Sequence, residues 1–366
     1  LLALFLASHN SSDQPIQQSI PCPNSSSMEN MLHLKPAHTL FPNCFALETE
    51  QLPPAVTSSA VALPIIDMSR SREEVRRAIL DAGKEFGFFQ VVNHGVSEEV
   101  LRDMKSVCEE FFQLPTGDKA HLYSEDNNKL NRLFSGSTFK TDSKNYWMDC
   151  LRLACPFPGI SDSVNHWPEK PQRLREVVEK YAVLTRGMGL EILELLCEGL
   201  GFRSGYFEGE QTDGMVSVSI IHYPPCPNPS RILGLPPHCD RNLITMVLSG
   251  AVRGLEVFYN GDWIKVEPLR NAFVINFGIQ LEVVTNGIMK SMEHRVVTNL
   301  ALPRTSVVTS LMATDDFLIG PAEELLCENN PRRYRNTVFR DFMRLYNKAL
   351  EESGGDVKQA IKYFKI

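Results

Sequence analysis

Apolar residues along the chain follow two spacings, and the change between them falls near residue 215. Before this point, three segments repeat apolar residues every three or four positions, and this period predicts helices. The predicted helices cover residues 71–86, 97–112 and 170–199. Short apolar runs predict strands at residues 63–67, 88–92 and 146–154. The polar stretch from 118 to 144 shows neither period and is expected to be a loop.

After residue 215, short β-rich runs alternate with Gly, Pro and Asn. Asn260-Gly261 is a strong signal for a two-residue hairpin turn. Strands are predicted at residues 216–221, 243–248, 255–259, 263–266, 272–276, 282–285, 293–298 and 306–313. Short strands at this spacing are typical of a jelly roll, or double-stranded β-helix. We therefore expect a mainly β fold with flanking helices, the last of them at 338–352.

These patterns divide the chain into regions. Residues 1–60 are rich in Ser, Pro and Asn, and we expect an unstructured leader, of which 1–27 lies upstream of the true start at Met28. The alternative is that the apolar opening is a clipped signal peptide, although it is too short to span a bilayer. We then expect an N-terminal region of helices and strands, a jelly-roll core and a helical tail, at residues 61–205, 206–320 and 321–366.

Composition narrows the class of partner. The 366 residues carry a net charge of −7, which argues against a nucleic acid or an anionic membrane as the main partner. The nine cysteines are scattered without a CxxC pair, which is typical of a reducing compartment. We therefore expect a cytoplasmic protein, monomeric by default, that acts on a small molecule.

Two histidines and one aspartate are the strongest candidates for chemistry. If residues 238–240 form a strand, His238 and Asp240 point the same way, and Cys239 points the other way as a packed thiol. His294 can supply a third ligand from another strand. Two histidines and one carboxylate on one face of a metal, with the opposite positions open, are typical of non-haem Fe(II) oxygenases.

Arg304 follows His294 by 10 residues (304 − 294) and suggests a carboxylate co-substrate beside the metal. Its planar guanidinium fits a carboxylate through two hydrogen bonds, which a lysine could not do. Ser306 shares the face of Arg304 on a strand and can donate one more hydrogen bond.

These motifs resemble those of the plant Fe(II)- and 2-oxoglutarate-dependent dioxygenases. The similarity also includes segments at 64–67, 87–95, 223–227, 286–287 and 293–296. Within the family, the chain is similar to the mugineic-acid dioxygenases at 28–30, 131–136, 150–158 and 238–245. It is similar to hyoscyamine 6-hydroxylase at 146–147, 167–171 and 197–201.

The resemblance implies an enzyme that hydroxylates a small specialised metabolite with O2 and releases succinate and CO2, with ascorbate as reductant. It implies Fe(II) ligation by His238, Asp240 and His294. It implies that 2-oxoglutarate is bound by Arg304, Ser306 and Tyr223. One position departs from the family, because Ile221 stands where most members have an asparagine near the metal-bound end of the co-substrate.

The substrate is open, as is the choice between hydroxylation, desaturation and epoxidation. Candidate substrate contacts, by position in the chain, are Phe134, Tyr146, Arg152, Phe317 and Phe339. A mugineic-acid-type siderophore, which is an amino-polycarboxylate, would need several cationic residues in the pocket. The candidates for that role are Arg132, Arg152 and Arg332.

Three alternatives stay open at this point. Related Fe(II) oxidases share the three ligands and the Arg-x-Ser motif, but use the arginine for a substrate carboxylate and need no 2-oxoglutarate. A catalytically impaired binding protein would account for Ile221. A zinc hydrolase is disfavoured because no acid with the usual spacing of a zinc-site base accompanies the ligands.

Overall fold

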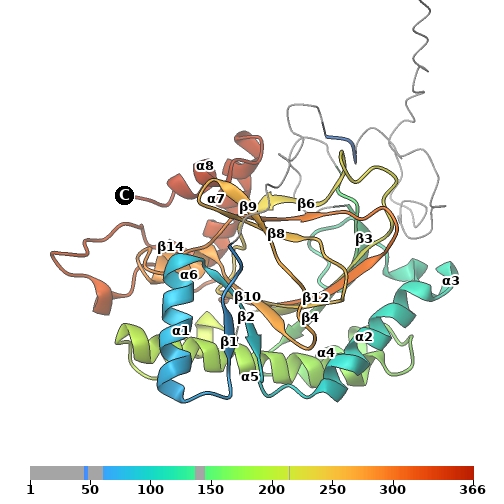
Figure 1. Cartoon of the computed structure of the whole chain (residues 1–366), viewed down its shortest axis with the longest axis horizontal. Coiled ribbons are helices and arrows are strands. Elements are labelled where there is room, and N and C mark those ends of the chain that lie inside the picture. Colours follow the sequence, from blue (N-terminus) through green and yellow to red (C-terminus); the bar gives the residue numbers. More distant parts are fainter. Residues whose placement is uncertain (1–44, 48–60, 137–144, 214) are drawn as a thin grey trace, which may run out of the picture.

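The computed structural model describes residues 45–47, 61–136, 145–213 and 215–366. Two sheets face each other, and helices cover the outer face of the larger one (Figure 1). In order, the large sheet holds β1 (Ile65–Asp67), β2 (Phe88–Val92), β10 (Phe273–Phe277), β7 (Ile244–Ser249), β12 (Arg304–Leu311), β5 (Met215–Tyr223), β4 (Asp149–Pro156) and β3 (Arg132–Ser135). The small sheet holds β6 (Leu233–His238), β11 (His294–Val297), β8 (Leu255–Tyr259) and β9 (Asp262–Lys265). The predicted jelly roll is confirmed.

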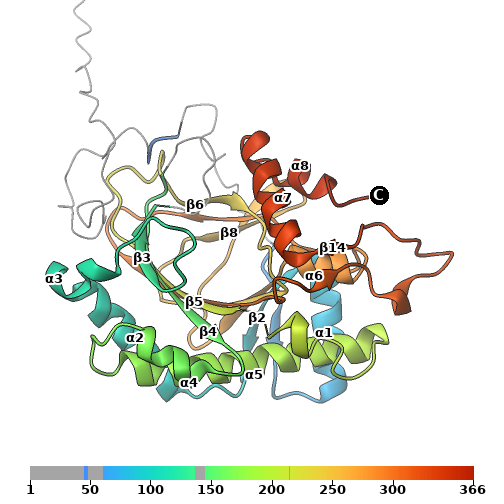
Figure 2. The ribbon, with the colours of Figure 1, turned by 180° about the vertical axis from the view of Figure 1, so that it is seen from behind.

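Helices α1 (Arg72–Glu85), α2 (Glu98–Gln113) and α5 (Leu174–Leu200) lie on the outer face of the large sheet, as Figures 1 and 2 both show. Their apolar stripes face α5 and the sheet, and form the largest hydrophobic core. Ser71 begins α1 with a reciprocal capping box to Glu74. Ser97 begins α2 by accepting a hydrogen bond from the amide of Val100. The three predicted helices are therefore confirmed, with ends shifted by a few residues.

The shorter elements complete the fold. The small helices are α3 (Thr116–Lys119), α4 (Ile160–Ser163) and α6 (Ile279–Val284). The C-terminal part holds β13 (Leu318–Ile319), β14 (Thr337–Val338), α7 (Phe339–Glu352) and α8 (Val357–Lys362). The predicted Asn260-Gly261 turn joins β8 to β9, with positive φ at both residues. No helix of the described ranges is both long and apolar enough to cross a membrane.

The predicted regions 61–205 and 206–320 share one sheet. Strands β1 to β4 come from the first region and pair with β5 and β10 of the second. The N-terminal region therefore builds both edges of the large sheet and is not a separate layer.

The prediction of a strand at 282–285 is wrong, because this segment belongs to helix α6. A short apolar run fits a buried helix as well as a buried strand. Thr285 donates its hydroxyl to the carbonyl of Leu281, as a helical residue does, and Asn286 and Gly287 take positive φ where the helix ends.

The prediction of a loop across 118–144 is wrong at residues 132–135, which form the edge strand β3. Arg132 is buried in this strand although it is charged, so the alternation of apolar and polar residues is hidden in the sequence. The later part of that stretch, 137–144, lies outside the described residues.

The predicted unstructured leader is wrong at residues 45–47. Phe45 packs edge-on against Trp147, with ring centroids 5.3 Å apart. The amide of Leu47 donates to the carbonyl of Arg231 over 2.8 Å, and its side chain packs on Tyr146. The rest of the leader lies outside the described residues.

A buried ion pair joins β11 to β8 on the face that points away from the large sheet. Arg295 lies opposite Glu256, and both its Nε and its Nη2 are 2.8 Å from the same carboxylate oxygen. The two side chains are only 3% and 4% exposed, and the guanidinium lies 4.0 Å from the centre of the Trp263 ring. The pair therefore holds the strand that carries His294.

We expect Arg295→Met to lower the free energy of unfolding by about 3–5 kcal/mol, because it leaves the Glu256 carboxylate buried without a partner. Urea unfolding of the purified protein measures this. The double variant Arg295→Met with Glu256→Leu removes both charges and should recover most of the loss. Equal losses in the single and the double variant would contradict a role for the pair.

Candidate metal centre and co-substrate pocket

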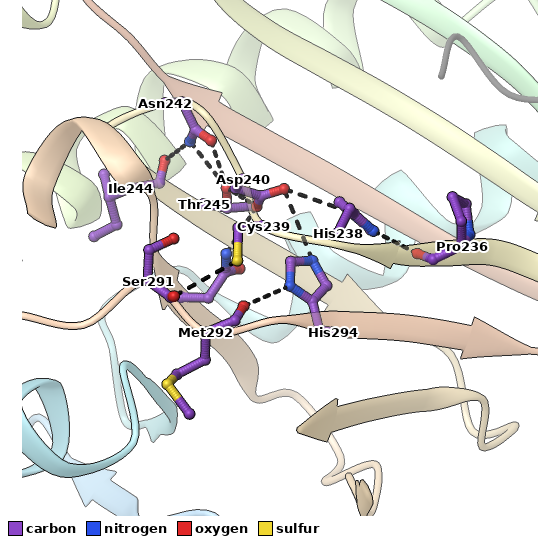
Figure 3. Close-up of polar contacts among 11 residues, drawn as sticks. Pro236, His238, Cys239, Asp240, Asn242, Ile244, Thr245, Ser291, Met292 and His294 are labelled. Atoms are coloured by element: carbon purple, nitrogen blue, oxygen red, sulfur yellow. Dashed lines mark hydrogen bonds and ion pairs between the residues drawn. The ribbon is translucent and has the colours of Figure 1, made fainter. Parts of the chain in front are cut away.

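His238, Asp240 and His294 come together between the two sheets (Figure 3). His238 ends β6 and His294 begins β11, where the two residues are direct cross-strand neighbours. Asp240 Oδ1 lies 3.7 Å from Nε2 of His238 and 3.8 Å from Nε2 of His294. We call these three residues the triad.

The triad forms by a different route from the one expected. Strand β6 ends at His238, so Asp240 does not share a strand face with it, and the expectation based on alternation is wrong. Asp240 instead lies in the turn that leads to β7, and its carboxylate points back toward the histidines. The Cys239 thiol points to the carbonyl of Ser291, at 3.6 Å, and packs in the C-terminal hydrophobic cluster.

Backbone carbonyls fix which nitrogen of each imidazole faces the centre. Nδ1 of His238 lies 2.8 Å from the carbonyl of Pro236, and Nδ1 of His294 lies 3.1 Å from the carbonyl of Met292. A carbonyl can only accept, so each Nδ1 donates its proton to the carbonyl, and each Nε2 faces the Asp240 carboxylate.

The second oxygen of Asp240 is held from the other side. Oδ2 accepts hydrogen bonds from the hydroxyl of Thr245, at 2.5 Å, and from the side-chain amide of Asn276, at 2.7 Å. These bonds leave Oδ1 directed at the two imidazoles. Such contacts behind a metal ligand orient it and tune its affinity.

Charge in the triad suits a divalent cation. Burial lowers the pKa of His238, and the neighbouring His294 lowers it further, so the His238 imidazole is neutral near neutral pH. Burial opposes ionisation of Asp240, but the two histidines and its hydrogen bonds lower its pKa overall. Two imidazoles and one carboxylate on a single side match the facial donor set of non-haem Fe(II), so the residues fit this metal.

Helix α6 supports the two segments that carry Asp240 and His294. The amide of Ile279 donates to the carbonyl of Asp240 over 2.7 Å. Glu282 accepts the amide of Ser291, at 2.9 Å, and the hydroxyl of Tyr334, at 2.6 Å, and so holds the loop that precedes His294. A Cβ on Gly278 would lie 1.9 Å from the carbonyl oxygen of Asn242, so only glycine allows this close approach.

Arg304 and its neighbours form a cationic end to the same cavity. Arg304 lies opposite Tyr223 in the register of β12 and β5, and its guanidinium is 5.1 Å from the centre of the tyrosine ring. It donates to the hydroxyls of Ser306, at 3.3 Å, and Ser249, at 3.4 Å. Arg304 is only 5% exposed and forms no ion pair with any residue that the structure describes. A buried guanidinium without an anion is costly, so the site suits the carboxylate of a ligand.

Tyr223 keeps its proton in this setting. Burial raises its pKa to about 12, although the nearby positive charge of Arg304 opposes the rise. The hydroxyl can therefore donate to a carboxylate at neutral pH. Ile221 lies next to Ser306 on the inner face of the same sheet and offers only apolar contact.

A cavity of about 260 Å³ extends from the triad between the sheets. Of the predicted substrate contacts, it is lined by Phe134, Arg152 and Phe339. Tyr146 and Phe317 do not line it, because Tyr146 packs on Leu47 and Leu233 and Phe317 packs against the C-terminal cluster.

Two of the arginines suggested for substrate binding are engaged elsewhere. Arg132 lies over the Phe134 ring at 4.3 Å and donates to the carbonyl of Ser124 and the side chain of Asn127. Arg332 pairs with Glu323 and Asn336 outside the cavity. The expectation for both residues is therefore wrong, and only Arg152 of the three lines the cavity.

Sequence reasoning assigned no role to four residues that orient the triad or line the cavity. These are Thr245, Ser249, Asn276 and Arg241. A signal existed for Asn276, a single amide inside the apolar run of β10. Ser249 and Arg241 gave none, because their contacts with Arg304 and Asn347 join distant segments. Thr245 contacts Asp240 from only five residues away, but no role was assigned to it.

The fold and the triad define a non-haem iron oxygenase, and comparisons with known proteins agree. The family model described as the 2OG-Fe(II) oxygenase superfamily matches residues 215–312. A second, described as the N-terminal part of a non-haem dioxygenase in morphine synthesis, matches residues 63–170.

The similar proteins cover nearly the whole described chain. The 2′-deoxymugineic-acid 2′-dioxygenase of Hordeum vulgare is 61% identical over 320 residues, which are 87% of this chain and 94% of that protein. Mugineic-acid 3-dioxygenase of the same plant is 54% identical, with the same two coverages. Hyoscyamine 6-dioxygenase of Hyoscyamus niger is 36% identical over 83% of this chain and 90% of its own length. A crystal structure of JOX2 in complex with 2OG, Fe and JA has a TM-score of 0.79 at 29% identity, covering 90% of this chain and 96% of that one.

The chain therefore belongs to the 2OG-Fe(II) oxygenase superfamily. It is a dioxygenase that uses Fe(II) and 2-oxoglutarate, as the resemblance predicted. The same findings favour this activity over the alternatives of an oxidase without 2-oxoglutarate and an impaired binding protein.

We expect Thr245→Val to weaken Fe(II) binding by about 10–100-fold, because the Asp240 carboxylate loses one of the two groups that direct it. Anaerobic titration of the metal-free protein with Fe(II) measures this. Thr305→Val is the matched control, since the Thr305 hydroxyl bonds His222 and not the triad. Equal Fe(II) affinity in the Thr245 variant and in the control would contradict the role of Thr245.

Proposed function

We propose that this dioxygenase hydroxylates a siderophore of the 2′-deoxymugineic-acid type. The observation that carries the proposal is the 61% identity to the barley 2′-dioxygenase, which extends over 94% of that protein. The barley 3-dioxygenase is also similar, at 54% identity. The assay must therefore determine which carbon of the substrate is oxidised.

The proposed roles of the residues follow from their contacts. His238, Asp240 and His294 hold Fe(II) through the two Nε2 atoms and Asp240 Oδ1. Arg304 binds the distal carboxylate of 2-oxoglutarate, with Ser306 and Tyr223 as further hydrogen-bond donors. When bound, Fe(II) with 2-oxoglutarate and O2 supplies the oxidation of an unactivated C–H bond, with release of succinate and CO2.

The protein's remaining role is to position the metal ligands and the substrate. The two sheets enclose the triad and limit the access of water, and the back-side hydrogen bonds keep the three ligand atoms pointing at one position. No side chain needs to act as a general acid or base in this scheme. A cytoplasmic location is part of the proposal, supported by the seven unpaired cysteines of the described ranges, six of them buried.

The direct test incubates the purified enzyme with Fe(II), ascorbate, 2-oxoglutarate and 2′-deoxymugineic acid. We expect a hydroxylated product and an equimolar amount of succinate, measured by mass spectrometry. Product without succinate would indicate an oxidase that does not use 2-oxoglutarate. Succinate without oxidation of this substrate would overturn the proposed substrate.

We expect Arg304→Lys to raise the KM for 2-oxoglutarate by about 10–100-fold, because an ammonium group cannot make the paired hydrogen bonds of a guanidinium. Fe(II) affinity should not change, since Arg304 does not contact the triad. Arg253→Lys, at an exposed ion pair with Glu267, is the control. An unchanged KM in the Arg304 variant would show that this residue does not bind the co-substrate.

A further inference from the structure

The cavity has a second cationic end, formed by Arg152 and Arg241. Arg152 of β4 lies opposite Ser219 of β5, whereas Arg304 of β12 lies opposite Tyr223. The two positions are four residue steps apart on β5, which corresponds to roughly 13 Å between backbone positions. Arg304 and Arg152 therefore lie at separate positions along the inner face of the sheet. The second end is therefore available to a different ligand.

Arg152 has an unsatisfied guanidinium. It is half-buried, its Nε is buried without a hydrogen-bond partner, and it forms no ion pair within the described part of the chain. The ring of Phe134 lies 6.0 Å from the guanidinium on one side. A cation in this state lacks the anion that would offset its desolvation.

Arg241 adds positive charge at the same place. It borders the cavity next to Asp240, and it donates a hydrogen bond to Asn347 of α7, which holds the side chain in the wall. Arg241 and Arg152 line the same cavity. Arg132 lies opposite Arg152 in the pairing of β3 with β4.

The rest of the lining does not neutralise these charges. The only carboxylate among the described lining residues is Asp240, which is directed at the histidines. The lining also includes the hydroxyl-bearing residues Ser217, Ser219 and Ser310. Apolar contacts come from Phe339 and Met343 of α7. This surface suits a hydrophilic anion with a short aliphatic frame and not a flat, uncharged ring system.

We propose that Arg152 and Arg241 bind a carboxylate of the primary substrate, so that the enzyme selects small carboxylate-bearing metabolites. This rests on the proposed function, in which the substrate is oxidised at the triad. The two cationic ends bind different ligands. Arg304 binds the keto acid, and Arg152 and Arg241 orient the substrate carbon toward the metal position. Arg152 and Arg241 are specificity-determining residues in this scheme.

The test compares Arg152→Gln with the wild type in steady-state assays with 2′-deoxymugineic acid. We expect the KM for this substrate to rise by about 10–100-fold, because a charge-assisted hydrogen bond is lost. The KM for 2-oxoglutarate should change much less than the KM for the substrate, because Arg304 binds the co-substrate. Arg152→Lys keeps the charge and should restore part of the affinity, while Arg253→Gln at an exposed site should behave as wild type. An unchanged substrate KM in Arg152→Gln would overturn the proposal.

Substrate derivatives give a second readout that does not depend on how well a variant folds. Each carboxylate of 2′-deoxymugineic acid is converted in turn to its amide. One amide should raise the wild-type KM as much as Arg152→Gln does, and should cause no further loss in that variant. Full activity of every amide with the wild type, or equal losses in wild type and variant, would contradict carboxylate recognition by Arg152.

A panel of small metabolites tests the carboxylate site even if 2′-deoxymugineic acid is not the substrate. If 2′-deoxymugineic acid is not oxidised, carboxylic acids and their methyl esters are screened for faster succinate release. Stimulation by an acid, absent with its ester and lost in Arg152→Gln, would support the carboxylate site while the siderophore proposal fails. Stimulation only by uncharged compounds, or by none of the acids, would overturn the carboxylate site.

Discussion

The pairing of β6 with β11 is the constraint on which the site depends. It places His238 and His294 directly opposite each other, with ring centroids 4.2 Å apart, and carbonyls behind both rings accept from Nδ1 so that the two Nε2 atoms face Asp240. Asp240 meets them from a turn outside the sheet, so its position depends on contacts from β7, β10 and α6. The small sheet supplies two ligands, and the large sheet with α6 orients the third.

Charge inside the cavity follows from this arrangement. The triad contributes one carboxylate, which two hydrogen bonds direct toward the metal position. Arg304 lies at one end of the inner face, and Arg152 with Arg241 lies at the other. A desolvated cation is unfavourable in a folded protein unless an anion offsets the cost. We therefore infer that the cavity accommodates two anionic ligands, with Arg304 and Arg152 at separate positions along β5.

Much of this could be predicted from sequence, for identifiable physical reasons. The long helices have a clear apolar period and capping residues such as Ser71 and Ser97, and core strands such as β2 and β10 are short apolar runs. Helix α6 was misread because a buried helix of six residues has no exposed face that could reveal its period. Strand β3 was missed because the buried Arg132 breaks the alternation.

The site was predictable only in part. The ligand types and the arginine could be found by chemistry and by family resemblance, and the structure brings His238, Asp240 and His294 together. Arg241 and Ser249 make contacts with distant segments that no local pattern encodes, whereas Asn276 left a signal as a single amide in an apolar run. The most direct measurement of the central claim is anaerobic binding of Fe(II) and 2-oxoglutarate to wild type and to His294→Ala, followed by metal analysis and by the visible absorption of the complex. We predict equimolar iron and an absorption band that requires both components in the wild type, and neither in the variant. Equal iron binding and an unchanged band in His294→Ala would contradict the account.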